Sequence, residues 1–270
     1  LLAIKKLIPN ADFSAINVIN ADAKDVALVK NVLKDVAANV AVTIDAAGQI
    51  SAKDANDIAK VLTTGILKAT IKDGGIAATL KALSDIDGTV DDLTFKTTDK
   101  SAKASDLVAL AALIKTPANL DVSAVKTLTG DAKDATDIAS ALAIINTVPA
   151  TNLTEVKISG NVDVTDIKAI IDATSGKVTA TLAAARATEL VVELTDTTLT
   201  TGGNAINVTV NDTDAIDTSL VSASSDTVIS TTSFGLFNIY FAIFFSASNN
   251  WSYNTVILSN TLSIFYSPSI

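Results

Sequence analysis

The stretch from Ser51 to Asp73, SAKDANDIAKVLTTGILKATIKD, contains one amphipathic helix followed by one amphipathic strand. Ser51 is a typical helix N-cap, because its hydroxyl accepts a hydrogen bond from a free backbone N–H of the first turn. Apolar residues then recur at helical spacing up to Gly65, where we expect a left-handed residue to end the helix. From Leu67 to Ile71 they alternate with Lys and Thr, the period of a half-buried strand. Neither element can bury its apolar face alone, so stacked copies have to supply the core.

Variants of this helix–strand repeat follow one another along the chain. We predict helices at Asp22–Val36, Ser51–Thr63, Gly75–Leu83, Ser101–Ile114, Asp131–Ile145 and Asp163–Ala173. We predict strands at Val40–Ile44, Ile66–Ile71, Leu93–Thr97, Leu120–Val125, Leu153–Ile158 and Val178–Leu182. Strands joined through helices run parallel. The expected fold class is therefore α/β, a repetitive βα solenoid with one continuous parallel sheet that is covered by helices on one face.

A longer repeat overlies the short one. The segment Leu1–Ile19 matches Leu110–Leu128 in its helix end, its proline and its Asp-x-Ser-Ala motif. The match continues with Asp22–Asp25 against Asp131–Asp134, which sets the offset at 131 − 22 = 109 residues. The chain thus opens part-way through a repeat, and we expect it to be a segment of something longer.

Three regions are predicted from composition. Residues 1–215 carry the βα repeats, with a β-rich end at Leu190–Leu194 and Ile206–Val210, and residues 216–232 form a linker. Residues 233–270 carry no charge and hold the only Trp and most aromatic residues. We expect this tail to stand apart from the repeats. It is interpreted as non-native or disordered sequence, as a C-terminal export or anchoring signal, or as a packed strand pair, and membrane contact is expected only if it is an anchor.

Composition excludes several classes of function. The net charge of −9 without basic clusters argues against nucleic acid, whose phosphates require patches of Lys and Arg. The chain has no Cys, so it forms no disulfide and has no thiolate metal site. It also has no His, the usual general base at neutral pH. We therefore expect no enzyme activity, no catalytic residues and no organic cofactor.

Acidic turns are the candidate metal sites. Asp85, Asp87, Asp91 and Asp92 surround Gly88, and four carboxylates at one turn could hold a weak Ca²⁺, although a solvated turn is the favoured interpretation. The segment Asp45–Asp54 matches the second half of a calcium loop but lacks two acidic ligands. Residues 211–217 form a third acidic turn.

The face of the predicted sheet opposite the helices is polar and could form a binding surface. We expect it to display Lys68, Thr70, Thr94, Lys96, Lys157, Thr179 and Thr181.

The repeats SAKDANDIAKVLTTGILKATIKD and VDVTDIKAIIDATSGKVTATLAA resemble the Ala/Thr/Asp-rich repeats of very large surface or secreted proteins of aquatic bacteria. Those proteins are grouped with adhesins or with haemolysin-type calcium-binding proteins, whose glycine-rich nonapeptide does not occur here. The resemblance implies an extracellular or bacterial cell-surface location and a non-catalytic role as spacer or adhesive stalk. It implies as partners a surface ligand or neighbouring repeats of the same chain. The alternatives are a binding module on the polar face or acidic turns, with Ca²⁺ as an option, and a fragment of an enzyme whose active site lies elsewhere.

Overall fold

The computed structural model describes residues 7–8, 10–36, 39–148, 152–186, 190, 203–211, 228–234, 237–244 and 253–257. The chain divides into two compact units, which are defined by their internal contacts. Unit 1 comprises Leu1–Val125 with Ile144–Thr151, and unit 2 comprises Lys126–Ala143 with Asn152–Ile270. The fold is α/β, with a parallel sheet and helices in each unit, as the helix–strand alternation predicts.

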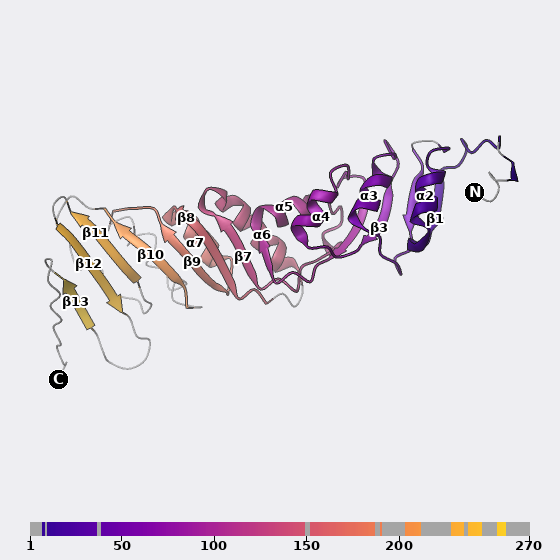
Figure 1. Ribbon diagram of the computed structural model, residues 1–270. Helices are drawn as coiled ribbons and strands as arrows, with labels where there is room; N and C mark the ends of the chain where they lie inside the picture. The colour runs from indigo at the N-terminus through magenta and orange to yellow at the C-terminus, as the bar shows by residue number, and fades with distance from the viewer. Residues whose placement is uncertain are drawn as a thin grey trace. The chain divides into compact units, whose positions relative to one another are not determined.

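Unit 1 contains a five-stranded sheet in the order β1-β2-β3-β4-β6, and each of its neighbouring strand pairs is parallel. Its strands are β1 (Val18–Ala21), β2 (Ala41–Ile44), β3 (Leu67–Ile71), β4 (Asp92–Lys96), β5 (Ser101–Lys103) and β6 (Leu120–Asp121). Its helical segments are η1 (Ala23–Asp25), α2 (Val26–Val32), α3 (Ala52–Ala59), α4 (Ile76–Ala82), α5 (Ala104–Ala112) and η2 (Pro117–Asn119). Helices α2 and α3 lie against β1 and β3 (Figure 1).

The core of unit 1 is a set of apolar ladders that run across the strands. Parallel register places Ile71 beside Phe95 and Phe95 beside Leu120, and all three side chains are buried. The residues between them on each strand are exposed or half-buried. Ile58 of α3 is fully buried and covers this apolar face. The helices therefore cover the side of the sheet that the period-two pattern predicts.

Local capping determines where α3 and α4 begin. The Ser51 hydroxyl oxygen accepts a hydrogen bond from the backbone N–H of Asp54 at 3.0 Å, so the predicted N-cap is confirmed. Helix α4 begins after Gly75, whose φ of 83° favours glycine. The carboxylate of Asp99, from the following repeat, accepts the N–H of Ile76 at 2.8 Å. Gly65 is not among the glycines with positive φ, and α3 already ends at Ala59, so the expected role of Gly65 was wrong.

Unit 2 contains a second sheet, in which β7, β8, β9, β10 and β11 follow one another in parallel and β12 and β13 continue it antiparallel. Its strands are β7 (Thr127–Asp131), β8 (Glu155–Val162), β9 (Lys177–Leu182), β10 (Ala205–Val210), β11 (Val228–Phe234), β12 (Phe237–Phe244) and β13 (Tyr253–Ile257) (Figure 1). The helical segments of this part of the chain are η3 (Ala132–Asp134), α6 (Ala135–Thr147) and α7 (Val164–Asp172).

The expectation of one continuous sheet was wrong, because the strands form two sheets. The predicted strand Leu120–Val125 is interrupted after Asp121, whose carboxylate accepts the N–H of Ser123 at 3.0 Å. Val125 N–H then bonds to Val122 O at 3.0 Å, which closes a turn before β7 begins. Asp at such a position favours a turn because its side chain bonds to the backbone two residues on. The segment Ser101–Lys103, predicted as the start of a helix, is β5, and the pattern also missed β1.

The tail after residue 232 differs from the expectation that it stands apart. Strand β11 pairs with β10 through Asn207 beside Ile229, and β12 and β13 extend the same sheet by backbone pairing. The domain boundaries at 215 and 232 remain predictions. The strand expected at Leu190–Leu194 lies outside the described residues except for Leu190.

The 109-residue repeat is confirmed by the positions of matching elements. Strand β1 begins at Val18 and β7 at Thr127, and η1 (23–25) and η3 (132–134) are both 109 residues apart. The core register is also the same, since Val29 and its counterpart Ile138 are both buried. Two copies of one sequence pattern therefore adopt one local structure at two places in the chain.

A pair of truncations tests the apolar face of α3. Ile58→Ala removes a fully buried side chain and should lower the free energy of unfolding by about 2–5 kcal/mol. Val61→Ala is the matched control, because Val61 is 40% exposed and its loss should cost under about 0.5 kcal/mol. Urea unfolding followed by circular dichroism measures both. Equal losses would contradict the assignment of the buried face.

Candidate functional site

The polar face of the unit 1 sheet carries a ladder of opposite charges. Parallel register places Lys68 beside Asp92 and Lys96 beside Asp121. Lys68 Nζ lies 3.0 Å from Asp92 Oδ2, and Lys96 Nζ lies 2.8 Å from Asp121 Oδ2. Each pair joins two neighbouring strands, so the lysine of one repeat is neutralised by the aspartate of the next.

The lysines and threonines predicted for this face in both units are exposed or half-buried, as expected. The sequence analysis missed the aspartates that pair with the lysines. The predicted strand at Leu93 begins one residue too late to include Asp92, although the alternation extends to it. Asp121 was inside a predicted strand, opposite in phase to Leu120, so its place on the polar face was available from the pattern.

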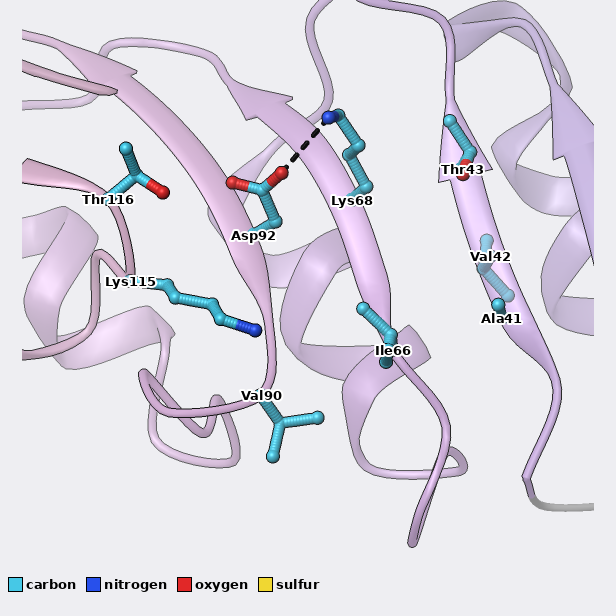
Figure 2. A pocket seen from close by; sticks show the side chains of 9 residues that line it. All are labelled: Ala41, Val42, Thr43, Ile66, Lys68, Val90, Asp92, Lys115 and Thr116. Atoms are coloured by element: carbon cyan, nitrogen blue, oxygen red, sulfur yellow. Dashed lines mark ion pairs between the residues drawn. The ribbon is translucent and has the colours of Figure 1, made fainter. Parts of the chain in front are cut away.

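A shallow, open pocket of about 290 Å³ lies on this polar face. Residues that precede or begin the strands line it: Ala41, Val42, Thr43, Ile66, Lys68, Val90, Asp92, Lys115 and Thr116. Figure 2 shows Lys68 and Asp92 directed at each other, while the Lys115 side chain extends toward β4. The lining combines one neutralised ion pair, one further amine and two hydroxyls. Such a set can hold a small ligand by charge and hydrogen bonds, but it contains no nucleophile beside a base.

The four carboxylates predicted as a calcium site have separate partners. Asp85 accepts from the Asn56 amide at 2.7 Å, and Asp87 accepts the N–H of Thr89 at 2.9 Å. Asp92 lies on the polar face beside Lys68, whereas Asp91 is buried on the other side of the strand. In the part of the chain that the structure describes, no three His, Cys, Asp or Glu side chains form a metal-ligating group. The turn therefore does not assemble these four side chains into one ligand set.

The other two acidic turns are also accounted for. Asp45 accepts the N–H of Ala47 at 3.0 Å within its own turn. Asp54 receives Lys30 Nζ at 2.6 Å and takes part in capping α3. Residues 212–217 of the third turn lie outside the described residues.

Asp91 is a buried structural acceptor. Its two carboxylate oxygens accept the N–H of Leu67 at 2.8 Å and that of Asp87 at 3.1 Å, which joins the start of β3 to the turn before β4. Burial raises the pKa of the Asp91 carboxyl, and the two backbone hydrogen bonds partly oppose this shift. A perturbed carboxyl in a cleft can indicate catalysis, but Asp91 is outside the pocket lining and bonds only to the backbone.

Asp121 has the opposite shift. The ammonium of Lys96, with hydrogen bonds from Ser123, lowers the pKa of this carboxyl to about 2. Its side chain is about one third exposed, so solvent screens the pair and its net contribution to stability is small. The pair serves to set which strands lie side by side.

Comparison of the chain with protein-family models, with curated proteins and with solved structures found no match. Across the described residues, no helix has both the length and the apolar character required to cross a bilayer.

Two carboxyl groups predict how stability depends on pH. For Asp121, whose pKa is lowered from 3.8 to about 2, the stabilising contribution is present above the unfolded pKa and is lost as the pH falls toward about 2. Asp121→Asn should therefore reduce the loss of unfolding free energy between about pH 4 and about pH 2. Urea midpoints measured across this range test the expectation.

Asp91→Asn is the control with the opposite sign. A raised pKa means that the folded state holds this proton more tightly, so the contribution of Asp91 is present at low pH and is lost as pH rises. Its removal should make the loss of stability on acidification steeper. If both variants changed the slope in the same direction, one of the two assignments would be wrong.

Calcium should have little effect on the acidic turn at Asp85–Asp92, because its carboxylates already bind amide, backbone or lysine groups. The melting temperature in millimolar Ca²⁺ should match that in chelator. Asp87→Asn, which removes a charge from this turn, should behave in the same way as the unchanged chain. A calcium-dependent rise that Asp87→Asn abolishes would establish a metal site there.

Proposed function

We propose that this chain is a non-catalytic structural repeat segment of a large exported cell-surface protein, where it acts as a spacer or adhesive stalk. The proposed form is a βα solenoid in which helices cover one face and the C-terminal end becomes β-rich. The repeats are the functional elements in this proposal, since each provides length and a docking face for the next.

The observation that carries the proposal is a set of side-chain ties between successive repeats of unit 1. Lys30 binds Asp54, 24 residues on, and Asn56 forms two hydrogen bonds with Asp85, 29 residues on. Asp73 accepts the N–H of Thr98 at 2.7 Å, 25 residues on. These separations match the length of one repeat. Nearest-neighbour contacts of this kind are what make a repeat array stable along its length.

The chemistry of the surface is consistent with a passive, soluble segment. The lysines on the polar face of the unit 1 sheet are paired with aspartates, and the chain keeps a net charge of −9. A net charge far from zero keeps proteins soluble and apart from one another. Extracellular or cell-surface location is part of the proposal and rests on the resemblance of the repeats.

The second candidate is a binding module on the polar face. The observation that favours it is the open pocket with the amine of Lys115, which has no printed ion-pair partner among the described residues. A ligand there would be small and acidic. Lys115→Ala would then weaken its binding, whereas the spacer role would be unaffected.

An in-register insertion tests the solenoid. A second copy of residues 22–130, placed between Gly130 and Asp131, adds 109 residues to 270 and preserves every junction. If the repeats stack in a line, the radius of gyration should rise by about 1.4-fold, whereas a compact globule would rise by only about 1.1-fold. Small-angle X-ray scattering separates these outcomes.

The control insertion has the same composition but begins at residue 76, so that residues 76–130 precede residues 22–75. Its junctions place a helix against the wrong partner, and it should unfold at a lower temperature than the in-register insertion. Location has its own test, because antibodies against the chain should label intact cells of the source organism. Labelling only after permeabilisation would contradict the surface role without affecting the solenoid.

A further inference from the structure

The N-terminal turn of unit 1 is the counterpart of the turn that follows β6. In the 109-residue repeat, Asp12 corresponds to Asp121 and Phe13 to Val122. The hydrogen bonds correspond as well. Ser14 N–H donates to Asp12 at 2.8 Å, as Ser123 N–H donates to Asp121 at 3.0 Å.

The turn closure repeats too, since Ile16 N–H bonds to Phe13 O at 3.0 Å and Val125 N–H bonds to Val122 O at 3.0 Å. The two segments therefore share one local structure and differ only in what surrounds them.

The second copy shows what covers such a turn. Strand β6 pairs in parallel with β4, and the carbonyl of Asp121 accepts the N–H of Thr97 at 3.0 Å. Lys96 reaches the Asp121 carboxylate at 2.8 Å. Beneath this pairing, Val122 and Val125 are fully buried. A preceding repeat thus supplies a backbone donor, a cation and an apolar cover.

The first copy has none of these three in the described part of the chain. Phe13 and Ile16 are half-buried, and the exposed Asp12 carboxylate accepts hydrogen bonds only from Ser14. The pKa of Asp12 is lowered by Ser14 alone, with no lysine contributing, in contrast to Asp121. Nearby apolar side chains add to this surface, since Ile8 is 57% and Val18 is 53% exposed.

We infer that the edge at Ala11–Ile16 is a docking surface for a βα repeat of the same class as β4, bound by parallel strand addition. The incoming strand has the pattern of Asp92–Thr97, Asp-Leu-Thr-Phe-Lys-Thr. Its lysine pairs with the Asp12 carboxylate and the amide after it donates to the Asp12 carbonyl. Its phenylalanine covers the edge of the core beside Phe13 and Ile16.

Strand addition suits this edge, because main-chain hydrogen bonds supply affinity and alternate side chains supply specificity. The lysine–aspartate pair selects register, because a shift by one residue would turn the lysine to the opposite face. The inference rests on the internal repeat and does not depend on the proposed spacer role or on a cell-surface location.

The test supplies the occupant. A copy of residues 67–109 is joined in front of Leu1, so that its last residue precedes Leu1 as Ala109 precedes Leu110. Phe13→Trp, in a chain that also carries Trp251→Phe, makes the edge the site of the single Trp. Docking should shift Trp emission to shorter wavelength and reduce quenching by acrylamide. Unchanged emission and quenching, with the rest of the chain folded, would overturn the inference.

A control copy separates docking from mere attachment. The added residues carry the substitutions equivalent to Phe95→Asp and Lys96→Glu, which place an acid in the apolar cover and opposite Asp12. This copy should leave the Trp exposed, and a shift equal to that of the unaltered copy would contradict strand addition. NMR titration gives a second readout, since the pKa of Asp12 should fall when the unaltered copy is added. If the original chain instead forms a dimer that Phe13→Asp abolishes, the edge belongs to a second copy and the inference is wrong.

Discussion

Parallel register between neighbouring repeats is the constraint on which the rest of the structure depends. One repeat supplies a strand with apolar residues on one side and a helix with one apolar stripe, which is only part of a core. Register completes it by placing Ile71, Phe95 and Leu120 in a row across three strands. A slip of one residue would expose that entire row, so the apolar pattern specifies the alignment strongly.

The same register organises the polar chemistry on the opposite face. Because Lys68 and Asp92 occupy aligned positions on adjacent strands, their charges meet without further design. Lys96 and Asp121 repeat the arrangement one step along the sheet. Exposed pairs of this kind contribute little to stability, but like charges at these positions would disfavour pairing. The face is therefore a by-product of stacking as well as a surface, and this favours a structural role over a catalytic one.

Asp91 shows how a repeat protein uses a buried carboxyl without chemistry. Its oxygens satisfy two backbone N–H groups at the point where β3 begins and the next turn closes. Leaving a buried backbone donor without a partner costs about 1–3 kcal/mol, so the burial of this acid has a structural reason. Its neighbour Asp92 points to the other face and meets solvent and lysine. Adjacent aspartates in the sequence thus have unrelated environments, which is why the acidic turn is not one ligand set.

Helix and strand identity were determined by the sequence alone, because the 3.6 and 2.0 periods and the N-cap at Ser51 are local properties. The 109-residue repeat was also readable, since matched residues adopt matched turns at Asp12 and Asp121. Tertiary structure decided the number of sheets, because the turn after Asp121 ends one strand that the pattern had continued. It also decided the partners of Asp85, Asp91 and Asp92, since these lie one repeat away along the chain. Local patterns specify each repeat, whereas only the stacking of repeats determines which side chains meet.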